Sequence, residues 1–225
     1  PYDALMVNDS HRVGFSGKQG DPVDAAAEEF VRLLEARGVV VAAGAGTGEA
    51  PGSLQRLGLV ESQPLTAVVE ELLVNSDNNT AELLVKELGV AASGDGTREA
   101  GLEVIRETLD GWGVDTSEIV LSDGSGLGLD NRLTCAAVLE VLQRSDPRGP
   151  IGNGLPVAGE SGTLRDTFVG HPVAGRLRGK TGTLNNPPFN ADPPAVKALA
   201  GYLPVDGGGA VEYVLILNGP TISDQ

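Results

Sequence analysis

The sequence predicts an α+β fold, with helices along the first two thirds of the chain and antiparallel strands in the last third. Apolar residues recur at helical spacing in five segments that end before residue 145, and three runs rich in β-branched residues follow residue 175. Because helices and strands are segregated along the chain, a helical cluster on an antiparallel sheet is favoured over a parallel doubly wound sheet. The 225 residues are enough for one domain with its own core.

The five helical segments are bounded by residues that favour helix ends. In the first segment, Asp21 can accept from the free N–H groups, Pro22 suits the first helical position and Gly38 suits a left-handed exit. Residues 75–78 interrupt the pattern between the second and third segments, and Gly89 is expected to end the third. Helices are therefore expected at 21–38, 64–74, 80–88, 97–109 and 134–142.

The expected strands are short runs of β-branched residues. A glycine-rich stretch at 205–209 is typical of a hairpin loop between two of them. Residues 185–194 contain four prolines, which cannot donate to a strand ladder, so we expect an inserted loop there. The strands are expected at 39–43, 118–121, 176–184, 196–205 and 210–218.

Composition excludes several classes of function. The formal net charge of −15 disfavours nucleic acid and anionic membrane surfaces as partners, because it repels their phosphates. The single cysteine, Cys135, allows no internal disulfide, and only His11 and His171 could serve as histidine ligands or bases. These counts disfavour a zinc site and a Ser-His-Asp triad, and no metal or organic cofactor is implied by the sequence. No apolar run reaches the ~20 residues that span a bilayer.

Two tripeptides lie in contexts that suggest catalysis. Ser-Asp-Asn at 76–78 lies at the break between two expected helices, and Lys-Thr-Gly at 180–182 lies on an expected strand. Each has a simpler interpretation on its own, since Ser76 and Asp77 could cap the next helix and Lys180 could protect a sheet edge. With an upstream Ser-x-x-Lys, the two tripeptides form the motif set of class A β-lactamases and penicillin-binding proteins.

Longer blocks make the resemblance specific. Residues 73–84 (LVNSDNNTAELL), 123–134 (DGSGLGLDNRLT) and 162–184 (GTLRDTFVGHPVAGRLRGKTGTL) occur in this order. They resemble segments of the class C low-molecular-mass penicillin-binding proteins, which are D-alanyl-D-alanine carboxypeptidases and endopeptidases of the serine β-lactamase/DD-peptidase superfamily. The resemblance implies a β-lactamase/transpeptidase-like fold without a cofactor. It also implies export from the cytoplasm, and binding of β-lactam antibiotics and of peptidoglycan stem peptides that end in D-Ala-D-Ala.

The resemblance assigns catalytic roles to three residues. Ser76 would pass a proton between Lys180, the acylating centre and the departing nitrogen. Asn78 would hold the amide backbone of the substrate with its side-chain amide. Lys180 would supply positive potential for the terminal carboxylate and help to set local pKa values.

Five further residues are implied to bind substrate. Thr181 and Thr183 would hydrogen-bond the terminal carboxylate, and the Thr183 N–H would be one oxyanion donor. Gly182 would let the substrate lie against the strand as an added strand. Asp123 and Ser125 would line the site, although both could equally be turn residues.

One part of the motif set is missing, because no serine in the chain is followed three residues later by lysine. We therefore expect residues 1–225 to be the C-terminal part of a penicillin-binding domain that is incomplete at both ends. It would lack the upstream Ser-x-x-Lys segment, which would be its partner in the active site, and the final helix of the family. Two alternatives remain open: a β-lactamase or esterase on the same fold, and a noncatalytic homologue that binds peptidoglycan or β-lactams.

Overall fold

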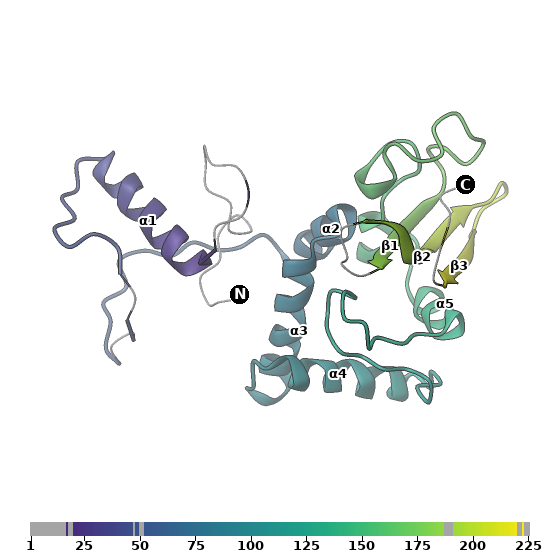
Figure 1. Ribbon diagram of the computed structural model, residues 1–225, viewed down its shortest axis with the longest axis horizontal. Helices are drawn as coiled ribbons and strands as arrows, with labels where there is room; N and C mark the ends of the chain where they lie inside the picture. Colours follow the sequence, from purple (N-terminus) through teal and green to yellow (C-terminus); the bar gives the residue numbers. More distant parts are fainter. Residues whose placement is uncertain are drawn as a thin grey trace. The chain divides into compact units, whose positions relative to one another are not determined.

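The computed structural model describes residues 17, 20–46, 48–49, 52–186, 191–219 and 222. It divides the chain into two compact units, Pro1–Glu61 and Ser62–Gln225 (Figure 1). The second unit carries both tripeptides and nearly all of the regular structure. Among the described residues, no helix combines the length and the apolar character needed to cross a bilayer.

In its described part, the first unit contains one helix, α1 (Pro22–Glu35). Its N-cap is Asp21, as predicted, whose carboxylate accepts from the backbone N–H groups of Val23 and Asp24 at 2.9 and 3.1 Å. The predicted strand at 39–43 is wrong, because this segment pairs with no strand in the described part of the chain. Val39 and Val40 are 47% and 90% exposed, and a β-branched run without a partner does not form a strand.

Three helices open the second unit: α2 (Leu65–Asn75), α3 (Asn78–Ser93) and α4 (Arg98–Gly111). Figure 1 shows α4 lying across the far end of α3. The prediction that Gly89 ends α3 is wrong, because the helix continues to Ser93 and exits through Gly94 at φ 79°. Gly89 instead allows a close approach, since a Cβ there would lie 2.4 Å from the carbonyl oxygen of Asp95.

The contact between α3 and α4 depends on a second glycine. A Cβ added to Gly101 would lie 1.8 Å from the carbonyl oxygen of Val85, a distance that no side chain can occupy. Val85 and Gly101 are both buried. The two helices can therefore pack with their backbones in contact only because residue 101 has no side chain.

The remaining short elements connect the helices to the sheet. The helix α5 (Cys135–Arg144) begins at Thr134, whose hydroxyl accepts from the N–H of Ala137 at 3.1 Å. The helix α6 (Pro150–Gly154) and the 3₁₀ turn η2 (Gly162–Leu164) were not expected from the sequence. The predicted strand at 118–121 is wrong, because only one bridge forms there, between Val120 and Arg132.

The sheet has three antiparallel strands in the order β1-β2-β3: β1 (Arg178–Asn186), β2 (Ala191–Pro204) and β3 (Ala210–Asn218). The three main strands and the α+β class are therefore confirmed. The loop predicted at 185–194 is partly wrong, because the strands run through Asn186 and resume at Ala191. The register of the β1–β2 pairing shifts on either side of Asn185, which pairs with Pro194, and residues 187–190 lie outside the described part of the chain.

One face of the sheet is buried against helix α5. Tyr202 on β2 is fully buried, and its hydroxyl donates to the carbonyl oxygen of Leu142 at 2.9 Å. On the other face, three residues of β3 are 51–61% exposed; these are Val211, Leu215 and Leu217. Lys180 pairs with Ala200 of β2, whose side chain belongs to the buried cluster, so the lysine lies on the helix-covered face.

Candidate active site

The break between α2 and α3 sets the backbone of Ser76 in an unusual conformation. Ser76 has φ 55° and ψ 49°, the left-handed region that residues other than glycine seldom adopt. Such a residue costs about 1–2 kcal/mol, so the surrounding structure must hold it there. Its half-buried side chain lies at the junction of α2 and α3.

The cap of α3 is Asp77 and not Ser76. One oxygen of Asp77 accepts from the N–H groups of Asn79 and Thr80 at 2.9 and 3.3 Å, and the other accepts from the Thr80 hydroxyl at 2.7 Å. The capping alternative therefore describes Asp77 alone. Because Asp77 accepts from the free N–H groups at the start of α3, the Ser76 side chain is available for other contacts.

A hydrogen bond joins Ser76 of the first tripeptide to Lys180 of the second. The Lys180 ammonium donates to the Ser76 hydroxyl oxygen at 2.6 Å and to the carbonyl oxygen of Thr181 at 2.8 Å. Burial lowers the pKa of the Lys180 ammonium, and no carboxylate lies within ion-pair distance of it in the described chain. Two residues 104 positions apart therefore form one unit, in which the Ser76 O–H remains free to donate.

Asn78 is the first residue of α3, two positions beyond Ser76. Its side chain is half-buried and makes no hydrogen bond to any described residue. Both the carbonyl and the amino group of its amide are therefore available to a ligand. Its predicted contact with substrate remains a prediction.

Strand β1 presents an open edge beyond Lys180. The Gly179 N–H donates to the carbonyl oxygen of Pro156 at 2.9 Å, away from β2, and past this point no described strand pairs with that edge. Because backbone groups alternate in direction, those of Thr181 and Thr183 face the same open side as those of Gly179. Thr183 is exposed, and a Cβ on Gly182 would lie 3.3 Å from the Ala198 side chain.

A residue that the sequence analysis did not single out touches this strand. The Thr181 hydroxyl donates to the hydroxyl of Thr163, on η2, at 2.8 Å. Thr163 belongs to the block at 162–184 that carries the family resemblance, and only its position in that block could have drawn attention to it.

The loop after Val120 has its own internal order. Asp123 accepts from the N–H of Gly126 at 2.6 Å, from the side chain of Asn131 at 3.0 Å and from the N–H of Gly128. These contacts favour the turn role for Asp123. The Ser125 hydroxyl makes no hydrogen bond to a described residue, and none joins this loop to Ser76 or Lys180.

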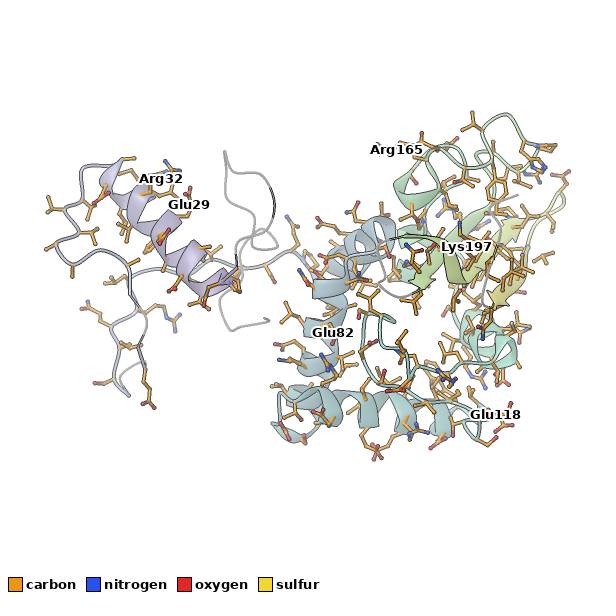
Figure 2. All side chains as sticks on the ribbon, in the orientation of Figure 1. Glu29, Arg32, Glu82, Glu118, Arg165 and Lys197 are labelled. Atoms are coloured by element: carbon orange, nitrogen blue, oxygen red, sulfur yellow. The ribbon has the colours of Figure 1, made fainter. Side chains whose placement is uncertain are left out.

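Glu82 anchors that loop to α3 and was also missed. It is 2% exposed, and one of its oxygens accepts from the N–H groups of Gly124 and Ser125, each at 3.1 Å. Its other oxygen pairs with the Arg98 guanidinium at 3.0 Å, and Figure 2 labels Glu82 on α3. Glu82 lies one turn after Asn78 on α3, so it connects the helix that follows the motif, the start of α4 and the loop. Helical periodicity alone does not distinguish it from the exposed Glu87.

Comparison with solved structures identifies the class of fold. The arrangement matches penicillin binding protein 4 (dacB) from Haemophilus influenzae with a TM-score of 0.73, at 24% identity over 92% of this chain and 45% of that one. The same protein complexed with a novel β-lactam matches with a TM-score of 0.73 at 23% identity, covering 92% and 47% of the two chains. The helical cluster and sheet therefore have the transpeptidase-like fold of the penicillin-binding proteins.

Sequence comparison identifies the family. The model of the D-Ala-D-Ala carboxypeptidase 3 (S13) family matches residues 6–225, and the chain belongs to this family. A D-alanyl-D-alanine carboxypeptidase from Actinomadura sp. (strain R39) is 36% identical over 88% of this chain and 37% of its own length. Carboxypeptidase DacB from Mycolicibacterium smegmatis is 35% identical over 72% of this chain and 36% of its own length. The predicted resemblance is confirmed, and the chain spans little more than a third of these curated relatives.

Proposed function

We propose that this chain forms two walls of the active site of a serine-type D-Ala-D-Ala carboxypeptidase. One wall is the helix break with Ser76 and Asn78, and the other is the edge strand β1 with Lys180. The contact of 2.6 Å between the Lys180 ammonium and the Ser76 hydroxyl supports this proposal most directly. Family membership and the names of the relatives agree with it.

The proposed reaction proceeds through an acyl-enzyme. A serine hydroxyl attacks the carbonyl carbon of the penultimate D-alanine, an ester forms and the C–N bond to the last D-alanine breaks. The proton of the attacking hydroxyl ends on the departing amine. Ser76 can relay it, because its oxygen accepts from Lys180 while its own hydrogen is free. Water then hydrolyses the ester and regenerates the serine.

The open edge of β1 suits an extended peptide. The substrate would add as a further strand, with its terminal carboxylate near Lys180, Thr181 and Thr183. The outward N–H of Thr183 is the proposed oxyanion donor, and one such donor contributes about 3 kcal/mol of transition-state stabilisation. β-Lactams, whose amide lies in a strained ring beside a carboxylate, would acylate the same serine.

The attacking serine is proposed to lie in a segment outside these 225 residues, because they contain no Ser-x-x-Lys. That segment would be the partner that completes the cleft. Peptidoglycan lies outside the cytoplasmic membrane, so we also propose that the whole protein works there.

A second candidate, a noncatalytic peptidoglycan- or β-lactam-binding homologue, is favoured by the same absence of Ser-x-x-Lys. The two candidates differ in one testable property. A catalytic protein forms a covalent adduct with penicillin, and a noncatalytic one binds it reversibly.

The test is labelling with a fluorescent penicillin. The full protein, expressed from its complete reading frame, should retain covalent label, whereas the 225-residue chain alone should not. Lys180→Ala and Ser76→Ala in the full protein should slow labelling by about 10²-fold or more, the usual contribution of a proton-transfer group. Ser62→Ala, at an exposed serine, is the matched control.

Three results would contradict the proposal. A reading frame without Ser-x-x-Lys, or a full protein that takes up no label, would leave the noncatalytic candidate. Label that forms and is rapidly hydrolysed would indicate a β-lactamase.

A further inference from the structure

We propose that Thr163 is a further substrate-binding residue, whose hydroxyl acts with that of Thr181 as a donor to the terminal carboxylate of the peptide. This inference rests on the proposed function and deepens it. The observation that carries it is the hydrogen bond of 2.8 Å between the two hydroxyls, beside the open edge of β1.

The turn that carries Thr163 is fixed from both sides. Gly162 has φ 54°, and a Cβ there would lie 2.3 Å from the carbonyl oxygen of Val74, two residues before Ser76. Leu164 is 2% exposed, so the other end of the turn is buried. The Thr163 side chain itself is exposed. The turn therefore holds a hydroxyl at a fixed, solvent-accessible position between the end of α2 and β1.

A count of hydrogens shows what the hydroxyl pair can do. Each threonine hydroxyl carries one hydrogen, and one of the two is used in the bond between them. If Thr181 donates, as the geometry has it, the hydrogen left over belongs to Thr163. If the bond reverses, it belongs to Thr181. Without a ligand the pair therefore has one free O–H donor. A carboxylate has two oxygens and can replace the bond between the hydroxyls by accepting from both, so Thr163 adds a second donor and its removal leaves only that of Thr181.

The surrounding charges favour an anionic ligand. The Lys180 ammonium donates to the carbonyl oxygen of Thr181, which places a cation next to the pair. No carboxylate neutralises that ammonium within ion-pair distance in the described chain. The chain as a whole carries a net charge of −15 and repels carboxylates, so a peptide carboxylate needs local donors to bind.

A purely structural role would have different consequences. A hydrogen bond between exposed hydroxyls that only holds η2 on β1 would affect all ligands of the cleft alike. A donor to the carboxylate affects only ligands that have one. The test therefore compares N-acetyl-D-alanyl-D-alanine with its C-terminal amide, which differs from it in this group.

The experiment measures the dissociation constants of both peptides by NMR titration of the full protein, with the serine of its Ser-x-x-Lys replaced by alanine so that neither peptide is cleaved. Thr163→Val should weaken binding of the acid by about tenfold, as expected for one hydrogen bond to a charged group, and leave binding of the amide unchanged. Thr163→Ser should restore binding of the acid. Thr167→Val is the matched control, because Thr167 is exposed and its hydroxyl has no partner among the described residues.

Thr181→Val separates failure of this inference from failure of the proposed function. If Thr181→Val weakens binding of the acid and Thr163→Val does not, the role of Thr163 is refuted and the carboxylate site stands. If the full protein without a change at Thr163 or Thr181 binds acid and amide equally, or binds neither, both the carboxylate site and the inference fail. Equal weakening of acid and amide by Thr163→Val would show a structural role and overturn the proposal.

Discussion

Replacement of Glu82 by alanine tests whether one buried carboxylate holds the loop after Val120 against α3. The change removes an ion pair and leaves the N–H groups of Gly124 and Ser125 without an acceptor. Breaking a buried pair costs about 3–5 kcal/mol, and since the Arg98 side chain is 39% exposed and water can replace its partner, we expect about 3 kcal/mol. Glu82→Gln keeps an acceptor for the two N–H groups and loses only the charge, so it should cost about 1–2 kcal/mol.

The assay is urea unfolding of the 225-residue chain, combined with amide hydrogen exchange at the two loop positions. Exchange at Gly124 and Ser125 should accelerate in Glu82→Ala and stay slow in Glu82→Gln. Glu87→Ala is the matched control, because Glu87 lies on the same helix and is exposed. If Glu82→Ala unfolds within about 0.5 kcal/mol of Glu87→Ala, the usual range for surface changes, the anchoring role is wrong.

Three further predictions concern the helix break, the lysine and the glycine contact. Ser76→Gly should be more stable than Ser76→Ala by about 1 kcal/mol in urea unfolding, because both lose the bond to Lys180 and only alanine keeps the left-handed strain; equal stabilities would argue against that strain. Burial lowers the pKa of Lys180 below its ordinary value of 10.5. At a pH between the lowered pKa and 10.5, the unfolded chain therefore binds more protons than the folded chain. The free energy of unfolding should therefore rise with pH through this window, and a Lys180→Met variant that keeps the same rise would disprove the assignment. Gly101→Ala should lower stability by about 3 kcal/mol, because its Cβ would lie 1.8 Å from the Val85 carbonyl oxygen. Gly111→Ala on the same helix, with nothing within 4 Å, should change stability by less than about 1 kcal/mol in the opposite direction, and similar melting temperatures for the two variants would contradict the packing.

Periodicity was sufficient to predict most of the fold because the helices and main strands each have an apolar face of their own. It failed where the decisive contact lies elsewhere in the chain. The runs at 39–43 and 118–121 have the composition of strands but lack a full partner strand among the residues that the structure describes. Gly89 has the composition of a helix end, yet it lies within α3 because α4 packs on it. No local pattern contains that information.

In the candidate site, too, local features could be predicted from the sequence, whereas contacts between distant segments could not. The two tripeptides were recognisable because their local contexts, a helix break and a strand, are visible in the sequence. That Ser76 meets Lys180 depends on the packing of segments 104 residues apart, and so could only be expected from the family resemblance. Glu82 and Thr163 carry no local signal, since one is an ordinary acidic residue of a helix and the other a polar residue of a short turn.

The exposed side of β3 affects how the isolated chain can be handled. Val211, Leu215 and Leu217 form an apolar stripe on an edge strand whose outer hydrogen-bonding groups pair with no other described strand. Exposed apolar side chains on an edge strand favour association between molecules as the protein concentration rises. Light scattering of dilute and concentrated samples should therefore reveal self-association, and Leu215→Lys should suppress it. Leu215 lies on β3, which β2 separates from the open edge of β1.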